Sequence, residues 1–89
     1  MEIMEVAKKG KSIISENLHL SYNINIDADG EVRDIHGAVV HNDTNVGFVS
    51  HNFARRTTNY NLNQDNGLEK EEIKSTFGVF MDDVEQLSS

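Results

Sequence analysis

The stretch that decides the fold is Leu18-His19-Leu20-Ser21-Tyr22-Asn23-Ile24-Asn25-Ile26. Five large apolar residues alternate in it with four polar ones, a period of two that is typical of a β-strand with one buried face. The turn-forming sequence Asp27-Ala28-Asp29-Gly30 follows directly, and a second β-rich segment begins after it. The pattern therefore predicts a β-hairpin whose apolar face lines the core.

The register of this hairpin follows from its turn and from its apolar pattern. Gly30 suits the left-handed position of a type I turn with a G1 bulge, which sets Asp27 opposite Glu31. Continuing that register unchanged would place charged and polar side chains on the apolar face. One extra residue near Arg33-Asp34, a second β-bulge, removes this conflict. The resulting pairs are Ile26 with Val32, Ile24 with Ile35, Tyr22 with Gly37, and Leu20 with Val39.

Two further strands are expected after the hairpin. The turn Asn42-Asp43-Thr44-Asn45 leads into a strand from Val46 to Phe53, and the segment from Thr57 to Gln64 suits an edge strand because it has few large apolar residues. If the turn is a four-residue loop, Val39 lies opposite Phe48. Three apolar residues then share the face of the sheet away from the core, namely Ala38, Val40 and Val49.

Helices are predicted at both ends of the chain. Between Ile3 and Ser15, apolar residues recur at spacings of three and four, which is typical of an amphipathic helix. Near the other end, Asn66 followed by Glu69 matches a capping box. It precedes an apolar stripe that consists of Ile73, Phe77, Phe80, Met81, Val84 and Leu87. Phe77 lies in the middle of this stripe, so we expect it in the core.

Together these elements predict one α+β domain over residues 1–89. Its order is an N-terminal helix, a three- to four-stranded antiparallel meander and a C-terminal helix, with both helices packed on one face of the sheet. A chain of 89 residues has no room for a second domain.

Composition restricts the function further. The net charge is −7 and the chain has no cysteine, which excludes a disulfide framework and a thiolate nucleophile. Nucleic-acid binders need a cationic surface, so we expect no direct contact with nucleic acid. The first residues have neither a signal-peptide core nor a membrane span. We therefore expect a cytoplasmic protein that does not contact the membrane.

The segment Asn25-x-Asp27-x-Asp29-Gly30 resembles the start of an EF-hand calcium loop. Such a loop ends in a bidentate glutamate at its twelfth position and has flanking helices. Here the twelfth position is His36, and strands are expected on both sides. The alternative interpretation, a hairpin turn that uses Asp and Gly for backbone reasons, explains the segment better.

The four histidines are His19, His36, His41 and His51. Imidazoles on neighbouring strands bind zinc or copper in many proteins, but none of these has a partner at a fixed motif spacing. Histidines scattered over a solvated surface explain the pattern more simply. We therefore assign no catalytic, cofactor-binding or metal-ligating residue, and expect no cofactor.

Two groups of residues are candidates for binding a partner. The first is the apolar group of Ala38, Val40 and Val49. The second is the acidic group of Asp82, Asp83 and Glu85, because acids near a helix C-terminus oppose the helix dipole and so do not serve helix stability. The simpler interpretation of the acids is a solvated helix face.

Three hypotheses for function follow. The first is a non-catalytic module that binds a protein partner or a second copy of itself, since an uncovered apolar group marks a contact surface. The second is an acidic inhibitor or nucleic-acid mimic that occupies a basic site on another protein. The third is a small metal-binding protein or enzyme that uses the histidines.

Overall fold

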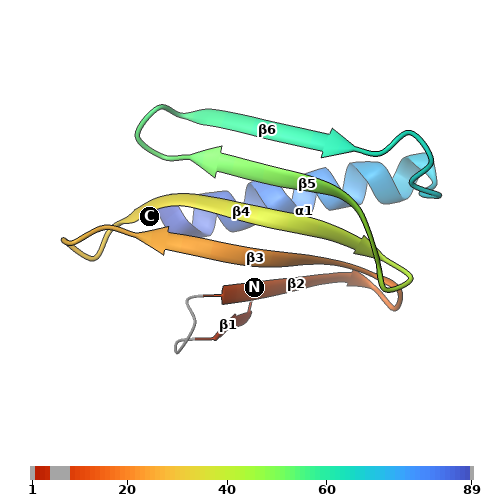
Figure 1. The fold of residues 1–89 in the computed structure, drawn as a ribbon, viewed down its shortest axis with the longest axis horizontal. Helices are drawn as coiled ribbons and strands as arrows, with labels where there is room; N and C mark the ends of the chain where they lie inside the picture. The colour runs from red at the N-terminus through yellow and green to blue at the C-terminus, as the bar shows by residue number, and fades with distance from the viewer. Residues whose placement is uncertain (1, 5–8, 89) are drawn as a thin grey trace.

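The computed structural model describes residues 2–4 and 9–88, and these form an antiparallel sheet with a single helix behind it (Figure 1). The six strands lie side by side in chain order, which makes the sheet a meander. The strands are β1 (Glu2–Met4), β2 (Lys9–Ser15), β3 (Leu18–Ile26), β4 (Val32–His41), β5 (Thr44–Asn52) and β6 (Thr57–Leu62), and α1 spans Lys70–Ser88.

The predicted N-terminal helix is wrong, and so is the count of three or four strands. The described part of the segment from Ile3 to Ser15 belongs to β1 and β2, while residues 5–8 lie outside the described residues. The buried inward positions of β2 are Gly10 and Ser12, which are too small to produce an apolar alternation. Ile14, at the bulge that follows, is partly buried against the core. Ile13 points away from the core and is 67% exposed. Among the described residues, the apolar positions that recur at spacings of three and four therefore lie on both faces of the sheet, and their helix-like spacing is coincidental.

The β3–β4 hairpin confirms the predicted register. The backbone N–H of Asp27 donates to the carbonyl of Glu31 at 2.8 Å, and Gly30 has a φ of 84°. Pairing shifts by one residue between Asn25 and Ile26, which leaves Arg33 as the extra residue of the predicted bulge. Every predicted apolar pair is present, from Ile26 with Val32 to Leu20 with Val39.

The carboxylate of Asp27 holds this turn and confirms its interpretation as a hairpin turn. Its Oδ1 accepts hydrogen bonds from the backbone N–H groups of Asp29 at 2.9 Å and Glu31 at 3.0 Å. Asn25 lies on β3 and donates to Asp34 across the ladder. The side chains of Asn25 and Asp27 therefore form hydrogen bonds within the hairpin and stabilise it.

The β4–β5 connection differs from the prediction. Asn42 and Asp43 both have positive φ, 52° and 63°, as in the tight two-residue turns that match the twist of a hairpin. His41 therefore pairs with Thr44, and the four-residue loop is wrong. A bulge then follows, and Val39 lies opposite Gly47 instead of Phe48.

This change of register reverses the orientation of β5. Phe48 pairs with Ala38 and faces away from the core, whereas Val49 pairs with Gly37 and is fully buried. The prediction that Val49 lies on the uncovered face is therefore wrong. Gly37 is required here, because a Cβ at this position would lie 2.8 Å from the Tyr22 ring and 2.9 Å from a methyl of Val49.

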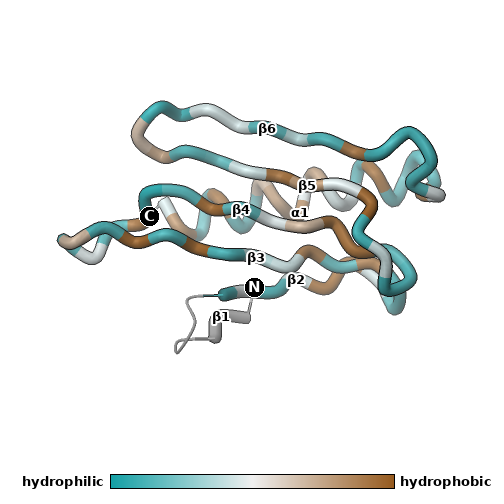
Figure 2. The backbone as a smooth tube through the Cα atoms, viewed as in Figure 1, coloured by the Kyte–Doolittle hydropathy of each residue, from teal (hydrophilic) through white to brown (hydrophobic). Residues whose placement is uncertain are grey.

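The core lies between the sheet and α1, as predicted for the C-terminal helix. The largest fully buried apolar side chains of the sheet are Leu18, Leu20 and Tyr22 of β3, together with Ile35, Val39 and Val49. Phe80 and Val84 of α1 complete the core, and the rings of Phe80 and Tyr22 lie 6.2 Å apart. Figure 2 shows apolar residues as brown segments spaced along β3, β4 and β5 and along α1.

The helix begins later than predicted, and Phe77 is less buried. The backbone N–H of Glu69 donates to the side chain of Glu72 at 3.0 Å, which is the reciprocal half of a capping box one turn beyond Asn66. Asn66 instead accepts from the N–H of Leu68 in the preceding turn. Phe77 lies at the flank of the helix, 40% exposed, with its ring edge-on to Tyr60 at 4.9 Å.

Candidate functional site

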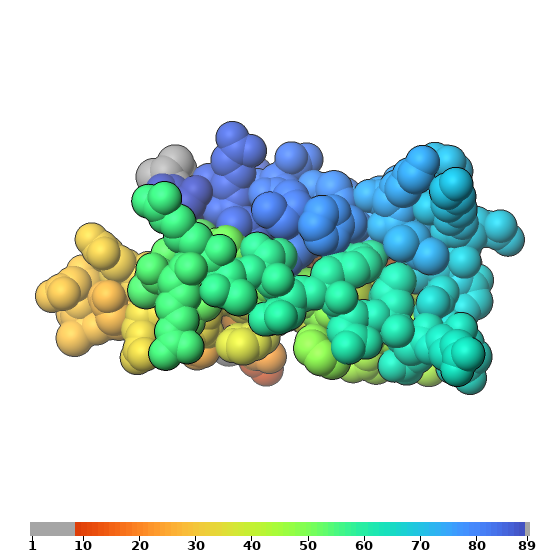
Figure 3. Space-filling view, turned by 90° about the horizontal axis from the view of Figure 1, so that it is seen from above, coloured from red at the N-terminus to blue at the C-terminus, as the bar shows by residue number. Residues whose placement is uncertain are grey.

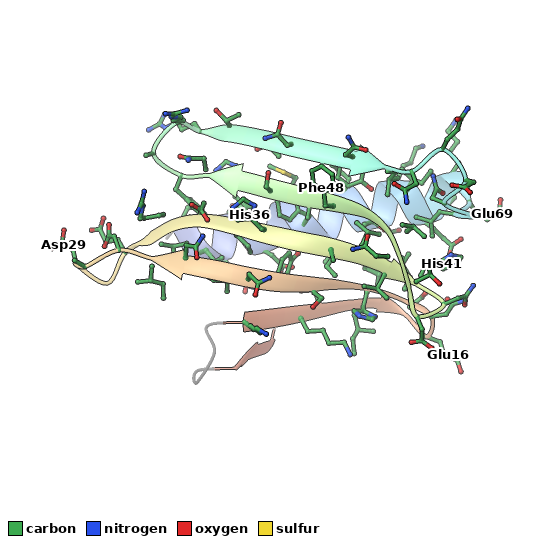
Figure 4. All side chains as sticks on the ribbon, viewed as in Figure 1. Glu16, Asp29, His36, His41, Phe48 and Glu69 are labelled. Carbon is green, nitrogen blue, oxygen red and sulfur yellow. The ribbon has the colours of Figure 1, made fainter. Side chains whose placement is uncertain are left out.

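The face of the sheet turned away from α1, here called the open face, is not covered by any of the described residues (Figure 4). Phe48 stands near its middle on β5 and is 53% exposed. Its neighbours across the ladders are Ala38 on β4 and Asn61 on β6, and Val40 is the next residue of β4 on the same face. We call Ala38, Val40 and Phe48 the Phe48 cluster.

The surroundings of the Phe48 cluster are polar and nearly neutral. A shallow hollow of about 350 Å³ lies beside the ring and is lined by Ser21, Asn23 and His36 among others. By strand alternation, the described charged side chains of the strands on this face are Lys9 and Lys11 at one side and Asp34 at one end. Arg55 of the β5–β6 turn lines a hollow together with Asp34 at that same end. Most of the remaining positions are small or amide side chains, namely Ser21, Asn23, Asn25, Asn45, Ser50, Asn59 and Asn61.

The structure separates the three predicted apolar binding residues. Ala38 and Val40 lie half-buried on the open face, as predicted, while Val49 belongs to the core. Sequence reasoning missed Phe48, the largest apolar side chain of the face. The signal that finds it is the pair Asn42-Asp43, since both residue types tolerate the left-handed conformation that a two-residue hairpin turn requires.

The structure also separates the three predicted acidic residues. Asp82 and Glu85 are exposed on α1, but Asp83 is buried. Its Oδ2 accepts hydrogen bonds from the Ser12 hydroxyl at 2.6 Å and from the Tyr22 hydroxyl at 2.7 Å. Asp83 is therefore not available to bind a partner, and the interpretation of the acids as a solvated helix face holds for Asp82 and Glu85 but is wrong for Asp83.

The Asp83 cluster (Ser12, Tyr22 and Asp83) joins α1 to β2 and β3. Burial raises the pKa of the Tyr22 hydroxyl far above its ordinary value of 10.0, and the hydrogen bond to Asp83 raises it further. The tyrosine therefore stays protonated and acts as a donor. Ser12 and Asp83 are 71 positions apart in sequence, so no local spacing announces their contact. The arrangement fixes the helix on the sheet and leaves no group free to react.

The histidines are spread over the sheet and do not form a site together. His36 Nε2 lies 3.2 Å from an Asp34 oxygen on the open face, and His51 Nδ1 lies 2.7 Å from the Thr58 hydroxyl. Burial lowers the pKa of His19, and nearby Lys11 lowers it further. Within residues 9–88, no three potential ligand side chains gather closely enough to hold a metal ion.

A hollow of about 660 Å³ lies where the β3–β4 and β5–β6 turns meet the end of α1. Val32, Phe53 and Leu87 supply its apolar lining, and the charged residues Glu31 and Arg56 also line it. His51 also lines it, edge-on to Phe53 at 4.7 Å. The titratable groups of this hollow are Glu31 and Arg56 of the turns and His51 of β5. No hydrogen bond or ion pair joins His51 to a carboxylate among the described residues, so the hollow offers no catalytic arrangement.

Comparison of the chain with known protein families, with curated proteins and with solved structures finds no significant match. In the described residues, the one helix present is not apolar enough to span a bilayer. The inference of function therefore rests on the surface of this protein.

Proposed function

We propose that this protein is a non-catalytic protein-binding module that recognises its partner with the open face of its sheet. The main observation is the position of Phe48, a large aromatic side chain that is half exposed on a central part of that face. Aromatic residues dominate the energetics of protein interfaces because they bury much apolar area with little loss of side-chain entropy. Phe48 is the expected anchor, and Ala38 and Val40 extend the apolar contact.

The distribution of charge supports this choice of face. Burying a charged group at an interface requires the removal of its water, which is costly unless a counter-charge is supplied. The centre of the open face carries hydroxyl and amide groups beside Phe48, and its described charges lie towards the border. An apolar centre with polar surroundings is the usual anatomy of a binding surface.

The same distribution speaks against the two alternatives. An acidic mimic needs a dense array of carboxylates, and Asp83 is held inside the protein by Ser12 and Tyr22. A metal site or enzyme needs convergent ligands or an activated group, and the histidines are separated. With no cysteine in the chain, we also propose the cytoplasm as its location.

The test is capture of a partner from lysate by immobilised protein, quantified by mass spectrometry. Phe48→Thr removes the aromatic anchor and keeps a residue that favours strands. Ile13→Thr is the matched control, because Ile13 is also a large exposed apolar residue of the open face but lies on β2. We expect Phe48→Thr to reduce capture of the principal partner at least about tenfold, the effect of losing a hot spot of about 1.4 kcal/mol or more. Ile13→Thr should leave it within about twofold.

Salt separates this proposal from the acidic alternative. Capture through the Phe48 cluster should survive about 0.5 M NaCl, because screening weakens contacts between exposed charges most. The proposal fails if Phe48→Thr captures as much as the parent. It also fails if about 0.5 M NaCl abolishes capture and if the double variant Asp82→Asn with Glu85→Gln, rather than Phe48→Thr, reduces it.

A further inference from the structure

A second surface of the molecule, separate from the Phe48 cluster, is the free edge of β6. Figure 3 looks directly onto this edge. There β6 crosses the picture below α1, and no other described segment covers it. The N–H of Asn63 donates to the carbonyl of Val46 on β5 at 2.8 Å. Since alternate residues of a strand direct their backbone groups to the same side, those of Thr58, Tyr60 and Leu62 point away from the sheet.

This edge lacks the usual protection against pairing. Edge strands are commonly kept apart by charged side chains, by proline or by being very short. The opposite edge of the sheet, β1, is three residues long. By contrast, β6 and the two residues after it read Thr57-Thr58-Asn59-Tyr60-Asn61-Leu62-Asn63-Gln64, with no charged residue and no proline.

We infer that β6 pairs with β6 of a second copy of this chain, antiparallel and around a two-fold axis at Tyr60, and so forms a dimer with one continuous sheet. Antiparallel pairing of identical strands requires an axis perpendicular to the sheet. Residues on the same face then lie opposite each other. The register centred on Tyr60 is the one that pairs all three outward-directed residues, because Thr58 meets Leu62 of the second copy and Tyr60 meets itself.

Charges at the two ends of the strand favour this register. Arg55 and Arg56 precede β6, and Asp65 follows it. In the register centred on Tyr60, the turn of each copy that contains Asp65 comes to the same end of the seam as the turn of the other copy that contains Arg55 and Arg56. A parallel arrangement would place arginines beside arginines. Opposite charges at both ends therefore select the antiparallel pairing.

The helix side of the same edge supplies apolar area. The Tyr60 ring packs edge-on against Phe77 at 4.9 Å, and Phe77 remains 40% exposed at the flank of α1. The two-fold axis brings Tyr60 and Phe77 of both copies together on the side of the sheet that α1 covers. This contact gives a reason for the exposure of Phe77, since the second copy covers what the monomer leaves open.

The test measures the dimer by sedimentation velocity from about 1 to about 300 μM protein, a range that brackets micromolar affinity. Asn59 and Asn61 are exposed on the open face of β6 and lie opposite each other across the proposed axis. Asn59→Lys with Asn61→Lys places lysine opposite lysine twice. Asn59→Lys with Asn61→Glu places lysine opposite glutamate twice. The control is Ser21→Lys with Asn23→Lys, which adds the same charge at exposed positions of β3 on the same face.

We expect the parent to approach twice the 10.0 kDa mass of one chain at high concentration. The lysine–lysine variant should dissociate at least about tenfold more readily, and the lysine–glutamate variant should dimerise at least as well as the parent. The β3 control should resemble the parent. A parent that stays monomeric throughout overturns the inference, as does a parent that grows beyond a dimer. Equal weakening of the dimer by both β6 variants overturns the inference as well. It would show that residues 59 and 61 of the two copies do not lie opposite each other.

Discussion

Replacing Val49 with alanine should destabilise the protein several times more than replacing Val40 with alanine, although the two residues are alike in size. Val49 is fully buried beneath α1 and packs beside the Gly37–Tyr22 contact. Val40 is half-buried on the open face, where no described segment covers it. The pair therefore tests the register of β5, on which the position of Phe48 depends.

The expected magnitudes follow from burial. Val49→Ala removes two buried carbon groups at about 0.8 kcal/mol each, and the space left among rigid neighbours adds about 1 kcal/mol. The expected loss is about 2.5 kcal/mol. Val40→Ala removes carbon groups that already contact water in part, so its loss should stay below about 1 kcal/mol.

The assay is equilibrium unfolding in urea, followed by circular dichroism. A chain of this length has a slope of about 1 kcal/mol per M, so Val49→Ala should lower the midpoint by about 2 M or more and Val40→Ala by less than about 1 M. The slope itself should not change. Equal losses, or a larger loss for Val40→Ala, would show that β5 pairs one residue out of the described register and that Phe48 faces the core.

Three further predictions concern the polar groups. Tyr22→Phe keeps the ring but removes the donor to Asp83, and should cost about 1 to 3 kcal/mol in urea unfolding; a loss below about 0.3 kcal/mol would contradict a stabilising bond. Burial raises the pKa values of Tyr22 and Tyr60 above 10.0, so the folded state holds their protons more tightly than the unfolded state. Stability is present below pH 10 and is lost above it, and tyrosinate absorbance should appear only together with unfolding; an independent titration at pH 10 would contradict this. Burial lowers the pKa of His19 below 6.5, so the unfolded state binds the proton more readily and stability falls as the pH falls through 6.5. His19→Gln should therefore reduce the drop in melting temperature between about pH 7.5 and about pH 5.5, and an unchanged drop would exclude this role.

The hairpin from Leu18 to His41 was predictable because its pattern tolerates one register. A slip of a single residue would turn every apolar side chain of β3 or β4 to the wrong face. The bulge at Arg33 follows from the same constraint, since Asp34 would otherwise face the core. The apolar stripe of α1 was predictable for a similar reason, because Phe80 and Val84 recur at helical spacing.

Strand β2 was not predictable from its sequence pattern. Its buried residues are small because α1 approaches closely there, and Ser12 meets Asp83 from the far end of the chain. A strand whose buried face carries Gly10 and Ser12, with Ile14 as its one large apolar residue, has no apolar alternation to recognise. The requirement for small residues comes from tertiary contact, which the local sequence does not record.

The prediction of the β4–β5 turn was wrong for a different reason, and this error has a larger consequence for the candidate site. The run Asn42-Asp43-Thr44-Asn45 suits either a two-residue or a four-residue loop, and the choice depends on whether Asn42 and Asp43 adopt positive φ. The shorter turn, with the bulge that follows it, exchanges Phe48 and Val49 between the two faces. The candidate site therefore depends on two backbone conformations that residue type alone leaves open.

The two proposed surfaces act on the same side of the molecule. An axis perpendicular to the sheet keeps the open faces of both copies on one side, so the dimer would present two Phe48 clusters. Three strand spacings separate the two β5 strands, about 14 Å. Phe48 pairs with Asn61, which lies opposite Asn59 of the second copy and hence level with its Ser50, an offset of two residues or about 7 Å. The two aromatic rings would then stand about 16 Å apart.

A partner with two copies of its recognition segment could occupy both Phe48 clusters at once, and its second contact would form at a high effective concentration. Weak binding to each Phe48 cluster would thus become tight binding to the dimer. Asn61 lies beside Phe48, so the informative comparison is between the two β6 variants: the lysine–lysine variant should weaken the capture of such a partner more than the lysine–glutamate variant, which changes the same two positions and keeps the dimer.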